Sequence, residues 1–345
     1  MSLNICIFGA GAWGSAMAIH LNRCGQRVTL VPRRLEQAAE IASARENSVY
    51  LPGVKFPQDI QIAANAAPAL MRCDAVIFAC PSKALRETVR KVAASLRARE
   101  NAGGKCAPAR PLVAISLCKG LESETFLRPE EVIRAELPGV CTGTLSGPTN
   151  AAEVAAALPV AVVFATDAPV EVAERIQREF SNDAFRIYLS ADVVGVELGG
   201  SLKNIYAIAA GICDGMRLGA NARASLLTRA LAEMSRIIAS FGGNAETVQG
   251  LGVIGDLIAT ATADWSRNRT FGLAIGSSGT CAALEKIASG ASVVEGYYAT
   301  KNFREYVRRR GVPAPILEIV YEIIYENRAP ADAIRALMTR DLKAE

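Results

Sequence analysis

The stretch Ile5-Cys-Ile-Phe-Gly9-Ala-Gly11-Ala-Trp-Gly14-Ser-Ala-Met-Ala-Ile-His-Leu21 decides the fold of this chain. An apolar run, three closely spaced glycines and a helical segment follow one another, which predicts a strand, a tight turn and a helix. In that arrangement Gly9 makes the turn, Gly11 lets a pyrophosphate approach the backbone, and Gly14 allows helix and strand to pack closely. The helix N-terminus also offers free N–H groups to phosphates. We therefore expect a dinucleotide-binding unit, and a plain tight turn is the alternative.

Outward from this stretch, short β-branched runs alternate with helical segments up to about residue 190, as in βαβ units. The strands are short and apolar, which indicates burial on both faces, as in a doubly wound parallel sheet of the Rossmann type. The predicted strands are Asn4 to Phe8, Val28 to Val31, Ala75 to Cys80, Leu112 to Leu117, Cys141 to Leu145, Val160 to Ala165 and Phe185 to Leu189. Helices are predicted at 86–98 and 170–180, and a surface loop at 101–111.

Beyond Ala191 the strand pattern stops, and alanine- and leucine-rich helical segments follow, beginning with 195–211 and 222–241. The length of 345 residues also suits two domains better than one. We predict a dinucleotide-binding Rossmann domain at 1–190 and an all-helical substrate and catalytic domain at 191–345.

Composition argues against several classes of protein. The net charge of +4 is spread along the chain and its densest basic run, Arg308-Arg309-Arg310, is short, so nucleic-acid binding is not indicated. Apolar stretches such as 154–165 and 205–213 are shorter than the roughly 20 residues of a membrane span. The N-terminus begins a strand at once and shows no export signal, so we expect a cytoplasmic protein without stable membrane insertion.

Cysteine and histidine usage limits the chemistry. Nine cysteines without a Cys-x-x-Cys pair are typical of reduced core residues in a cytoplasm. The single histidine, His20, falls in the first predicted helix, where packing or a surface position is the favoured interpretation. The sequence therefore predicts no metal site, and it leaves neither a histidine base nor a histidine-bound zinc available.

The end of the second predicted strand bears on the choice of cofactor. NAD-specific folds usually place an acidic residue there for the ribose hydroxyls. This chain has Arg33 and Arg34 instead, and two guanidiniums suit a 2′-phosphate. We expect NADP(H) to be preferred and NAD(H) to be accepted. A solvated arginine pair at the start of a helix is the alternative.

Lys203 is the most unusual polar residue, because its neighbours at helical spacing are small or apolar. Burial would lower the pKa of this lysine and let it exchange the proton that hydride transfer at an alcohol carbon requires. The alternative is a lysine that extends its ammonium to the surface.

Three other segments combine charge with glycine or apolar residues. Asp256 follows a glycine-rich turn and could act in a site or cap a helix. Ser266-Arg267-Asn268-Arg269 offers a guanidinium, a hydroxyl and an amide that suit a phosphate monoester, or else opens a solvated helix. Lys119 follows a buried strand, at the strand end where such folds bind ligands, so it could face the cofactor or a substrate phosphate.

Together these segments resemble the bacterial type of NAD(P)-dependent glycerol-3-phosphate dehydrogenase, essentially from end to end. The matching segments are Gly9-Ala-Gly-Ala-Trp-Gly14, Tyr50-Leu-Pro-Gly53, Lys119-Gly-Leu121, Leu145-Ser-Gly-Pro148, Gly195 to Gly211 around Leu-Lys-Asn, Gly219-Ala-Asn-Ala-Arg-Ala-Ser-Leu-Leu-Thr-Arg229, Gly255-Asp-Leu257, Ser266-Arg-Asn-Arg269 and Val294-Glu-Gly296. Two segments depart from the family's usual pattern: Thr149-Asn150-Ala151, where Phe usually follows Ser or Thr, and Gly252-Val253-Ile254, where Ala-Gly-Leu is usual.

The resemblance implies a reversible reduction of dihydroxyacetone phosphate to glycerol 3-phosphate, which supplies phospholipid synthesis, in a homodimer or larger homo-oligomer. It gives Lys203 the role of proton acceptor. The positions it implies for the substrate are Lys119, Gly147, Thr149, Lys203, Asp256, Ser266, Arg267 and Asn268. Those it implies for the cofactor, beside the three glycines of the first stretch, are Ala12, Trp13, Arg33, Arg34, Lys119, Ala151, Arg267, Val293 and Glu295.

Two other functions compete with this one. A β-hydroxyacid or 6-phosphogluconate dehydrogenase relative would share the architecture and a helical lysine, but the Ser-Arg-Asn-Arg and Gly-Asp-Leu segments argue against it. A catalytically silent dinucleotide sensor would not need both Lys203 and Asp256.

Overall fold

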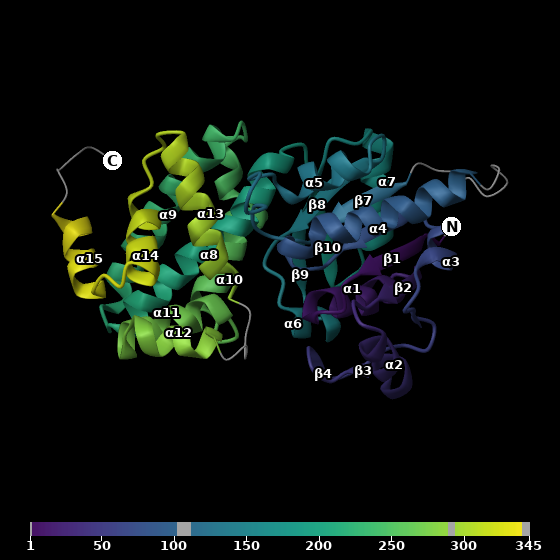
Figure 1. Cartoon of the computed structure of the whole chain (residues 1–345), viewed down its shortest axis with the longest axis horizontal. Coiled ribbons are helices and arrows are strands. Elements are labelled where there is room, and N and C mark those ends of the chain that lie inside the picture. Colours follow the sequence, from purple (N-terminus) through teal and green to yellow (C-terminus); the bar gives the residue numbers. More distant parts are fainter. Residues whose placement is uncertain (1, 102–111, 289–293, 340–345) are drawn as a thin grey trace. The chain divides into compact units, whose positions relative to one another are not determined.

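The computed structural model describes residues 2–101, 112–288 and 294–339. The chain divides into two compact units. The first consists of residues 1–119 and 127–193, and the second of residues 120–126 and 194–345. Figure 1 shows the elements of both. Two predictions fall outside the described residues: the surface loop, from residue 102 to 111, and the cofactor contact of Val293.

The first unit is built on an eight-stranded sheet with the order β10-β9-β8-β7-β6-β1-β2-β5. The seven predicted strands are all present, with ends that differ by at most two residues from the prediction. They are β1 (Asn4–Phe8), β2 (Arg27–Val31), β6 (Ala75–Phe78), β7 (Val113–Ser116), β8 (Cys141–Ser146), β9 (Val160–Thr166) and β10 (Phe185–Ser190). The sequence did not indicate β5 (Gln61–Ile62) or the hairpin of β3 (Glu46–Asn47) and β4 (Leu51–Lys55), because these strands are short or largely exposed.

The sheet is mostly parallel, as predicted, but one pair differs. Strands β8 and β9 are antiparallel, with Gly143 opposite Thr166 and Ser146 opposite Val163. A parallel pair needs a crossover that returns the chain to the end of the sheet where the first strand begins. The connection through α6 (Ala151–Ala155) instead stays at the end where β8 finishes. Strands β9 and β10 therefore run opposite to the other six. Apolar composition reports the burial of a strand and not its direction.

Helices cover both faces of this sheet, as the buried strand pattern predicts. Side chains alternate along β1, so that Ile5 and Ile7 pack with the α1 helix while Cys6 and Phe8 pack with α4. In Figure 1, α4 and α5 lie together over one face. The helices of this unit are α1 (Ala12–Arg23), α2 (Leu35–Ala44), α3 (Ala67–Leu70), α4 (Ser82–Asn101), α5 (Pro129–Glu136), α6 and α7 (Val170–Phe180).

The second unit is helical throughout its described part, in agreement with the prediction. Its core gathers apolar side chains of α8, α9, α13 and α14 around the fully buried Tyr206. The helices are α8 (Val193–Gly215), α9 (Gly219–Ser240), α10 (Asp256–Thr262), α11 (Arg267–Ser278), α12 (Thr280–Ala288), α13 (Glu295–Arg309), α14 (Pro315–Tyr325) and α15 (Pro330–Met338). A 3₁₀ turn (Ala245–Gln249) and a π-helical turn (Leu251–Gly255) precede α10.

Helices α8 and α11 approach so closely that their backbones are in contact. A Cβ added to Gly211 of α8 would lie 2.1 Å from the carbonyl oxygen of Arg269, and one added to Gly272 of α11 would lie 2.0 Å from that of Ile208. The glycines recur at a spacing of four residues, as Gly215 and Gly276, so they line one face of each helix. Only glycine fits this contact.

The short segment 120–126 belongs to the helical unit although the sheet unit flanks it on both sides. The backbone N–H of Gly120 donates to Ser201 Oγ on α8 (2.7 Å), and Asn302 of α13 donates to the carbonyl oxygen of Leu121 (3.0 Å). The Leu121 side chain is 3% exposed in the helical core. These bonds fix the segment to α8 and α13.

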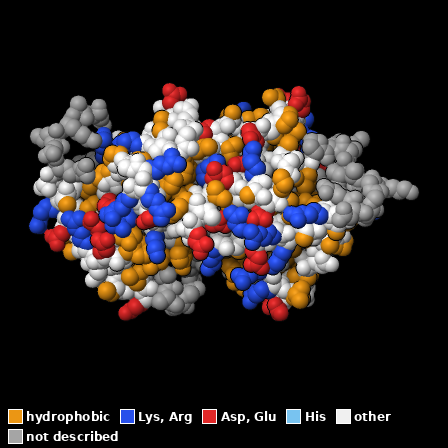
Figure 2. Space-filling view, turned by 45° about the horizontal axis from the view of Figure 1, so that its top comes forward, with side chains coloured by type: hydrophobic (Ala, Val, Ile, Leu, Met, Phe, Trp, Pro, Cys, Tyr) orange, Lys and Arg blue, Asp and Glu red, His pale blue; other side chains and the backbone are white. Residues whose placement is uncertain are grey.

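The surface carries charges of both signs, and Figure 2 shows basic and acidic side chains interspersed on one face. Two arginines of the basic run at 308–310 are in ion pairs: Arg308 contacts Glu318 at 2.5 Å and Arg309 contacts Glu305 at 2.7 Å. Within the described ranges, no helix has both the length and the apolar character needed to cross a membrane.

Candidate active site

The glycine-rich turn has the geometry that a dinucleotide needs. Gly9 has a φ of +114°, and a Cβ there would lie 2.6 Å from the carbonyl oxygen of Ala79. A Cβ at Gly14 would lie 2.0 Å from the carbonyl oxygen of Gly9, so this glycine allows α1 to pack on the turn. A Cβ at Gly11, by contrast, would meet nothing within 4 Å among the described residues. The backbone at Gly11 is therefore open to a ligand.

The first turn of α1 faces the same opening with its own N–H groups. The helix begins after Gly11, an N-cap residue that has no side chain to accept them. Ala12 and Trp13 in this turn are partly exposed. A helix start of this kind attracts a phosphate through its unpaired N–H groups and its dipole, so the residues present fit a dinucleotide.

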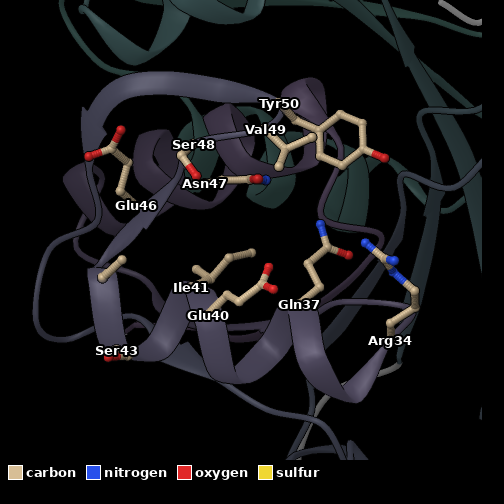
Figure 3. Close-up of a pocket in the computed structure, with 11 residues that line it drawn as sticks. Arg34, Gln37, Glu40, Ile41, Ser43, Glu46, Asn47, Ser48, Val49 and Tyr50 are labelled. Atoms are coloured by element: carbon tan, nitrogen blue, oxygen red, sulfur yellow. The ribbon is translucent and has the colours of Figure 1, made fainter. Parts of the chain in front are cut away.

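Arg33 and Arg34 lie between β2 and α2, where the sequence places the cofactor-selecting position. Both side chains are exposed, and Arg34 is the N-cap residue of α2. Arg34 also lines a cavity of about 330 Å³ between α2 and the β3–β4 hairpin (Figure 3). Both guanidiniums thus follow the carboxyl end of β2, and Arg34 stands beside space for a charged group.

Other proposed ligands follow the strands β7 and β8. Lys119 is partly exposed three residues after β7, and Thr149 and Ala151 are partly exposed after β8. A Cβ at Gly147 would come 3.0 Å from the Cα of Val162, which favours glycine there. Asn150, one of the two departures from the family pattern, is the N-cap of α6 and accepts from the N–H of Glu153 at 3.1 Å. Capping of α6 therefore explains why a polar residue is found at position 150.

In the helical unit, Lys203 lies in a buried polar site. The side chain is 7% exposed, and its Nζ donates to a carboxylate oxygen of Asp256 and, at 2.8 Å, to Thr260 Oγ1. Asp256 and Thr260 are one turn apart on α10 and are 1% and 3% exposed. The burial expected for Lys203 is confirmed, and the alternative of an ammonium in solvent is wrong. The alternative role of Asp256, as a helix cap, does not account for its carboxylate, which pairs with Lys203.

A chain of amides lies beside the lysine. Asn268 of α11 donates to Asn204 Oδ1 at 2.8 Å and accepts from the N–H of Gly296 at 2.9 Å. Asn204 in turn donates to Glu295 Oε2 at 3.3 Å. These bonds join α8, α11 and the start of α13, and they fix Asn268 and Glu295, which the sequence proposes as ligands, next to the residue that follows Lys203.

The remaining proposed ligands stand at the start of α11. Ser266 is 2% exposed and is the N-cap residue, with its Oγ accepting from the N–H of Arg269 at 3.2 Å. The Arg267 side chain is exposed. Arg269 instead pairs with Asp214 and Asp264, each at 2.9 Å. Of the two arginines, Arg267 is thus the one that stands in solvent.

Val253, within the second departure from the family pattern, lies in the π-helical turn and packs against a glycine of α8. A Cβ on Gly199 would overlap Val253 Cγ2 at 2.2 Å, so the valine fills space that glycine leaves on α8. Gly199 is one turn before Lys203, and the π-helical turn leads directly into Asp256. This contact sets α10 against α8 where the ion pair forms.

Sequence reasoning missed Thr260, Asn204 and Ser201. A signal existed for Thr260, since it stands four residues after Asp256 and so shares its helix face. His20 has a packing role: Nε2 donates to the carbonyl oxygen of Phe180 at 2.7 Å, and burial lowers the pKa of the ring to about 4. The eight described cysteines are free thiols, but Cys281 is exposed on α12 and not in the core.

Comparison with known proteins agrees with this geometry. The N-terminal family model of NAD-dependent glycerol-3-phosphate dehydrogenase matches residues 4–171, and the C-terminal model matches residues 192–335. Glycerol-3-phosphate dehydrogenase [NAD(P)+] of Chlorobium limicola is 40% identical over 99% of both chains. The enzyme of the same name from Cupriavidus necator is 42% identical over 99% of this chain and all of that protein.

A solved structure gives the same result. The crystal structure of glycerol-3-phosphate dehydrogenase from Coxiella burnetii has a TM-score of 0.88 and 34% identity, covering 98% of this chain and 99% of that one. D-mandelate dehydrogenase, at 14% identity and a TM-score of 0.56, shares the fold alone. Since both family models and full-length relatives match, the chain belongs to the NAD-dependent glycerol-3-phosphate dehydrogenase family.

Proposed function

We propose that Lys203 is the acid/base of this dehydrogenase, which interconverts dihydroxyacetone phosphate and glycerol 3-phosphate with a nicotinamide dinucleotide. The observation that carries the proposal is the buried contact of Lys203 with Asp256 and Thr260. When bound, the reduced nicotinamide supplies the hydride that the carbonyl carbon accepts. The Lys203 ammonium gives a proton to the carbonyl oxygen as negative charge develops there, and the neutral amine takes it back in the oxidation.

Asp256 and Thr260 have supporting roles in this proposal. The carboxylate stabilises the ammonium form in a site that excludes water, and the two acceptors fix two of the three N–H directions of the lysine. Asn268 and Arg267, at the start of α11, bind the substrate phosphate in this proposal. A guanidinium binds a phosphate through two charge-assisted hydrogen bonds. Lys119, Gly147, Thr149 and Ser266 complete the proposed substrate ligands.

For the cofactor we propose that Gly9 to Gly14 bind the pyrophosphate and that Arg33 and Arg34 bind the 2′-phosphate, so that NADP(H) is preferred and NAD(H) is accepted. The support is the open backbone at Gly11 and the exposure of both arginines. Lys119, Ala151, Arg267, Val293 and Glu295 are the further proposed contacts. In this proposal residues 1–190 are the dinucleotide domain and residues 191–345 the substrate domain.

The family resemblance supports two further proposals about the protein in the cell. We infer a homodimer, which analytical ultracentrifugation would show as twice the 36.5 kDa of the chain. We also infer a cytoplasmic enzyme whose product feeds phospholipid synthesis.

The experiment that tests the proposed chemistry is substitution of Lys203. We expect Lys203→Ala to lower kcat by about 10² to 10⁴, the contribution of a positioned acid or base. Oxidation of NADPH with dihydroxyacetone phosphate gives the rate, and Lys301→Ala, which removes an exposed lysine, is the control.

Because Lys203→Ala leaves the Asp256 carboxylate buried without the ammonium, its folding is checked by circular dichroism. The double variant Lys203→Met/Asp256→Asn removes both charges of the pair and is measured beside it. Near-normal kcat in either folded variant would show that another group exchanges the proton.

A further inference from the structure

The glycine-rich turn has one carbonyl group that two buried side chains hold in place. Gln37 of α2 donates from Nε2 to the carbonyl oxygen of Ala10 at 3.0 Å. Asn47 of β3 donates from Nδ2 to the same oxygen at 2.8 Å. The two side chains are only 8% and 2% exposed, so these bonds are shielded from water. Both lone pairs of this carbonyl oxygen are therefore occupied by side chains from outside the turn.

Asn47 holds more than the turn. Its Nδ2 also donates to Ser15 Oγ at 2.8 Å, and Ser15 is fully buried near the start of α1. Each of the two amide hydrogens thus has its own acceptor. One side chain thereby ties β3 both to the glycine-rich turn and to the first part of the helix whose N–H groups face the opening.

The orientation of this carbonyl fixes the orientation of the next N–H group. A peptide unit is planar and trans, so its C=O and N–H point in opposite directions. With the Ala10 oxygen turned toward Gln37 and Asn47, the N–H of Gly11 points away from them. Because Gly11 has no Cβ, rotation of this peptide is sterically cheap, and the turn itself does little to prevent it.

We propose that Gln37 and Asn47 are positioning residues of the cofactor site, which hold the Ala10–Gly11 peptide so that its N–H, and not its carbonyl oxygen, is presented to the dinucleotide pyrophosphate. The proposal rests on the proposed function of the glycine-rich turn. Without the two amides the peptide can turn over, and a carbonyl oxygen would then face the phosphate and repel it.

Figure 3 shows where the two amides stand. Gln37 and Arg34 come from the same end of α2, and Asn47 comes from the β3–β4 hairpin on the other side of the cavity. The bond from Gln37 therefore links the segment proposed to read the 2′-phosphate to the turn proposed to bind the pyrophosphate. The buried amide of Gln37 therefore connects the two parts of the proposed cofactor site by a hydrogen bond.

The proposal predicts a characteristic pattern of cofactor affinity. The pyrophosphate is common to NADPH and NADH, so the loss of the amides weakens both cofactors by the same factor. Loss of Arg33 and Arg34 would instead change their ratio. Each amide alone still holds the carbonyl, so Gln37→Ala and Asn47→Ala should each raise the dissociation constant a few-fold, and the double variant by about tenfold or more, above the product of the single effects.

The test is fluorescence titration of NADPH and NADH, combined with kcat and both KM values, for the two single variants, the double variant and Asn47→Asp. Aspartate keeps the shape of asparagine but presents an acceptor to the Ala10 carbonyl, so Asn47→Asp should weaken binding more than Asn47→Ala. At saturating cofactor, kcat and the KM for dihydroxyacetone phosphate should remain near wild type.

Gln26→Ala is the matched control. Gln26 is a buried amide of the same unit, 4% exposed, which accepts from Leu3 N and donates to the carbonyl oxygens of Cys24 and Glu179. It should lower the melting temperature like the test variants but leave both dissociation constants unchanged. The proposal is overturned if Gln26→Ala weakens the cofactors equally, or if the double variant binds them normally. If wild type binds neither cofactor, the proposed function itself fails.

Discussion

His20 shows what burial does to the one imidazole of the chain. Its Nε2–H donates to the Phe180 carbonyl oxygen, its ring lies 4.1 Å from that of Phe185, and burial lowers the pKa from 6.5 to about 4. The folded protein resists a proton that the unfolded chain binds. The contribution of His20 to the free energy of unfolding should therefore be fully present above pH 6.5. It should be lost as the pH drops from 6.5 toward 4, by about 3 kcal/mol in total.

Nuclear magnetic resonance can check this prediction without assignment, because the chain has a single histidine. The ring signals should titrate near pH 4, and His20→Gln should lose that part of the pH dependence of unfolding. A midpoint near 6.5 in the folded protein would contradict a buried, neutral ring.

Arg33 and Arg34 give the second prediction at this scale. We expect Arg33→Ala/Arg34→Ala to lower the ratio of kcat/KM for NADPH to that for NADH, since the two guanidiniums are proposed to bind the 2′-phosphate that only NADPH has. Both side chains are exposed, so salt should screen the attraction, and the wild-type ratio should fall as the ionic strength passes about 0.1 M.

Steady-state kinetics with both cofactors at low and high salt provide the measurement. Arg27→Ala, which changes an exposed arginine at the other end of β2, is the control. An unchanged ratio in the double variant would mean that the pair is a solvated start of α2.

The sequence predicts individual residues well where their neighbours are unusual. Lys203 stands out because small and apolar residues surround it along the helix, and its burial is confirmed. Thr260 and Asn204 do not stand out, because a threonine and an asparagine are ordinary in a helix. Their roles come from contacts across 57 and 64 residues of chain, with Lys203 and Asn268, and only the position of Thr260 four residues after Asp256 gives a local sign of this.

Among the elements, the contact of α8 with α11 decides how firmly the helical site is held. Gly272→Ala would place a methyl group 2.0 Å from the carbonyl oxygen of Ile208 and force the helices apart. We expect a loss of about 1–3 kcal/mol in the free energy of unfolding, as for other overpacked contacts. Since α11 carries Arg267 and Asn268, the KM for dihydroxyacetone phosphate should rise as well.

Chemical denaturation and steady-state kinetics measure the two effects. Ser277→Ala, at an exposed position of the same helix, should change neither. A Gly272→Ala protein with wild-type stability would show that the two helices can separate at little cost.

Sequence patterns predict the elements but not all of their relations. Seven strands follow from apolar runs, yet the antiparallel pairing of β8 with β9 does not, because direction depends on the route of the connection. The π-helical turn before Asp256 has no characteristic composition, and within it Val253 packs on Gly199 of a helix distant in sequence.

At the scale of the whole molecule, the two units have separate apolar cores, and the proposed pyrophosphate site lies in the first unit while the proposed acid/base Lys203 lies in the second. We expect NADPH to slow amide hydrogen exchange at residues 9–15 and glycerol 3-phosphate to slow it at residues 256–269. A ligand at a hundred times its dissociation constant stabilises the folded state by about 2.7 kcal/mol, which slows exchange through unfolding about a hundredfold.

Exchange followed by mass spectrometry locates the protection, and α15 serves as the internal control. Unchanged exchange at residues 9–15 with NADPH would contradict the proposed pyrophosphate site, and unchanged exchange at residues 256–269 with glycerol 3-phosphate would contradict the proposed substrate site. The sequence predicts two domains from the end of the strand pattern, but it gives no sign that residues 120–126 join the second unit, because seven residues are too few to show a periodicity.

That segment has a consequence for how the protein is made. Gly120 and Leu121 leave the ribosome long before their respective partners Ser201 and Asn302 exist, and Asn302 comes 181 residues after Leu121. While the sheet unit can assemble from residues already synthesised, this apolar side chain must stay unburied until α8 and then α13 emerge. Closing so long a loop is slow, so we expect this segment from the first half of the chain to dock late in biosynthesis, after α13 has emerged.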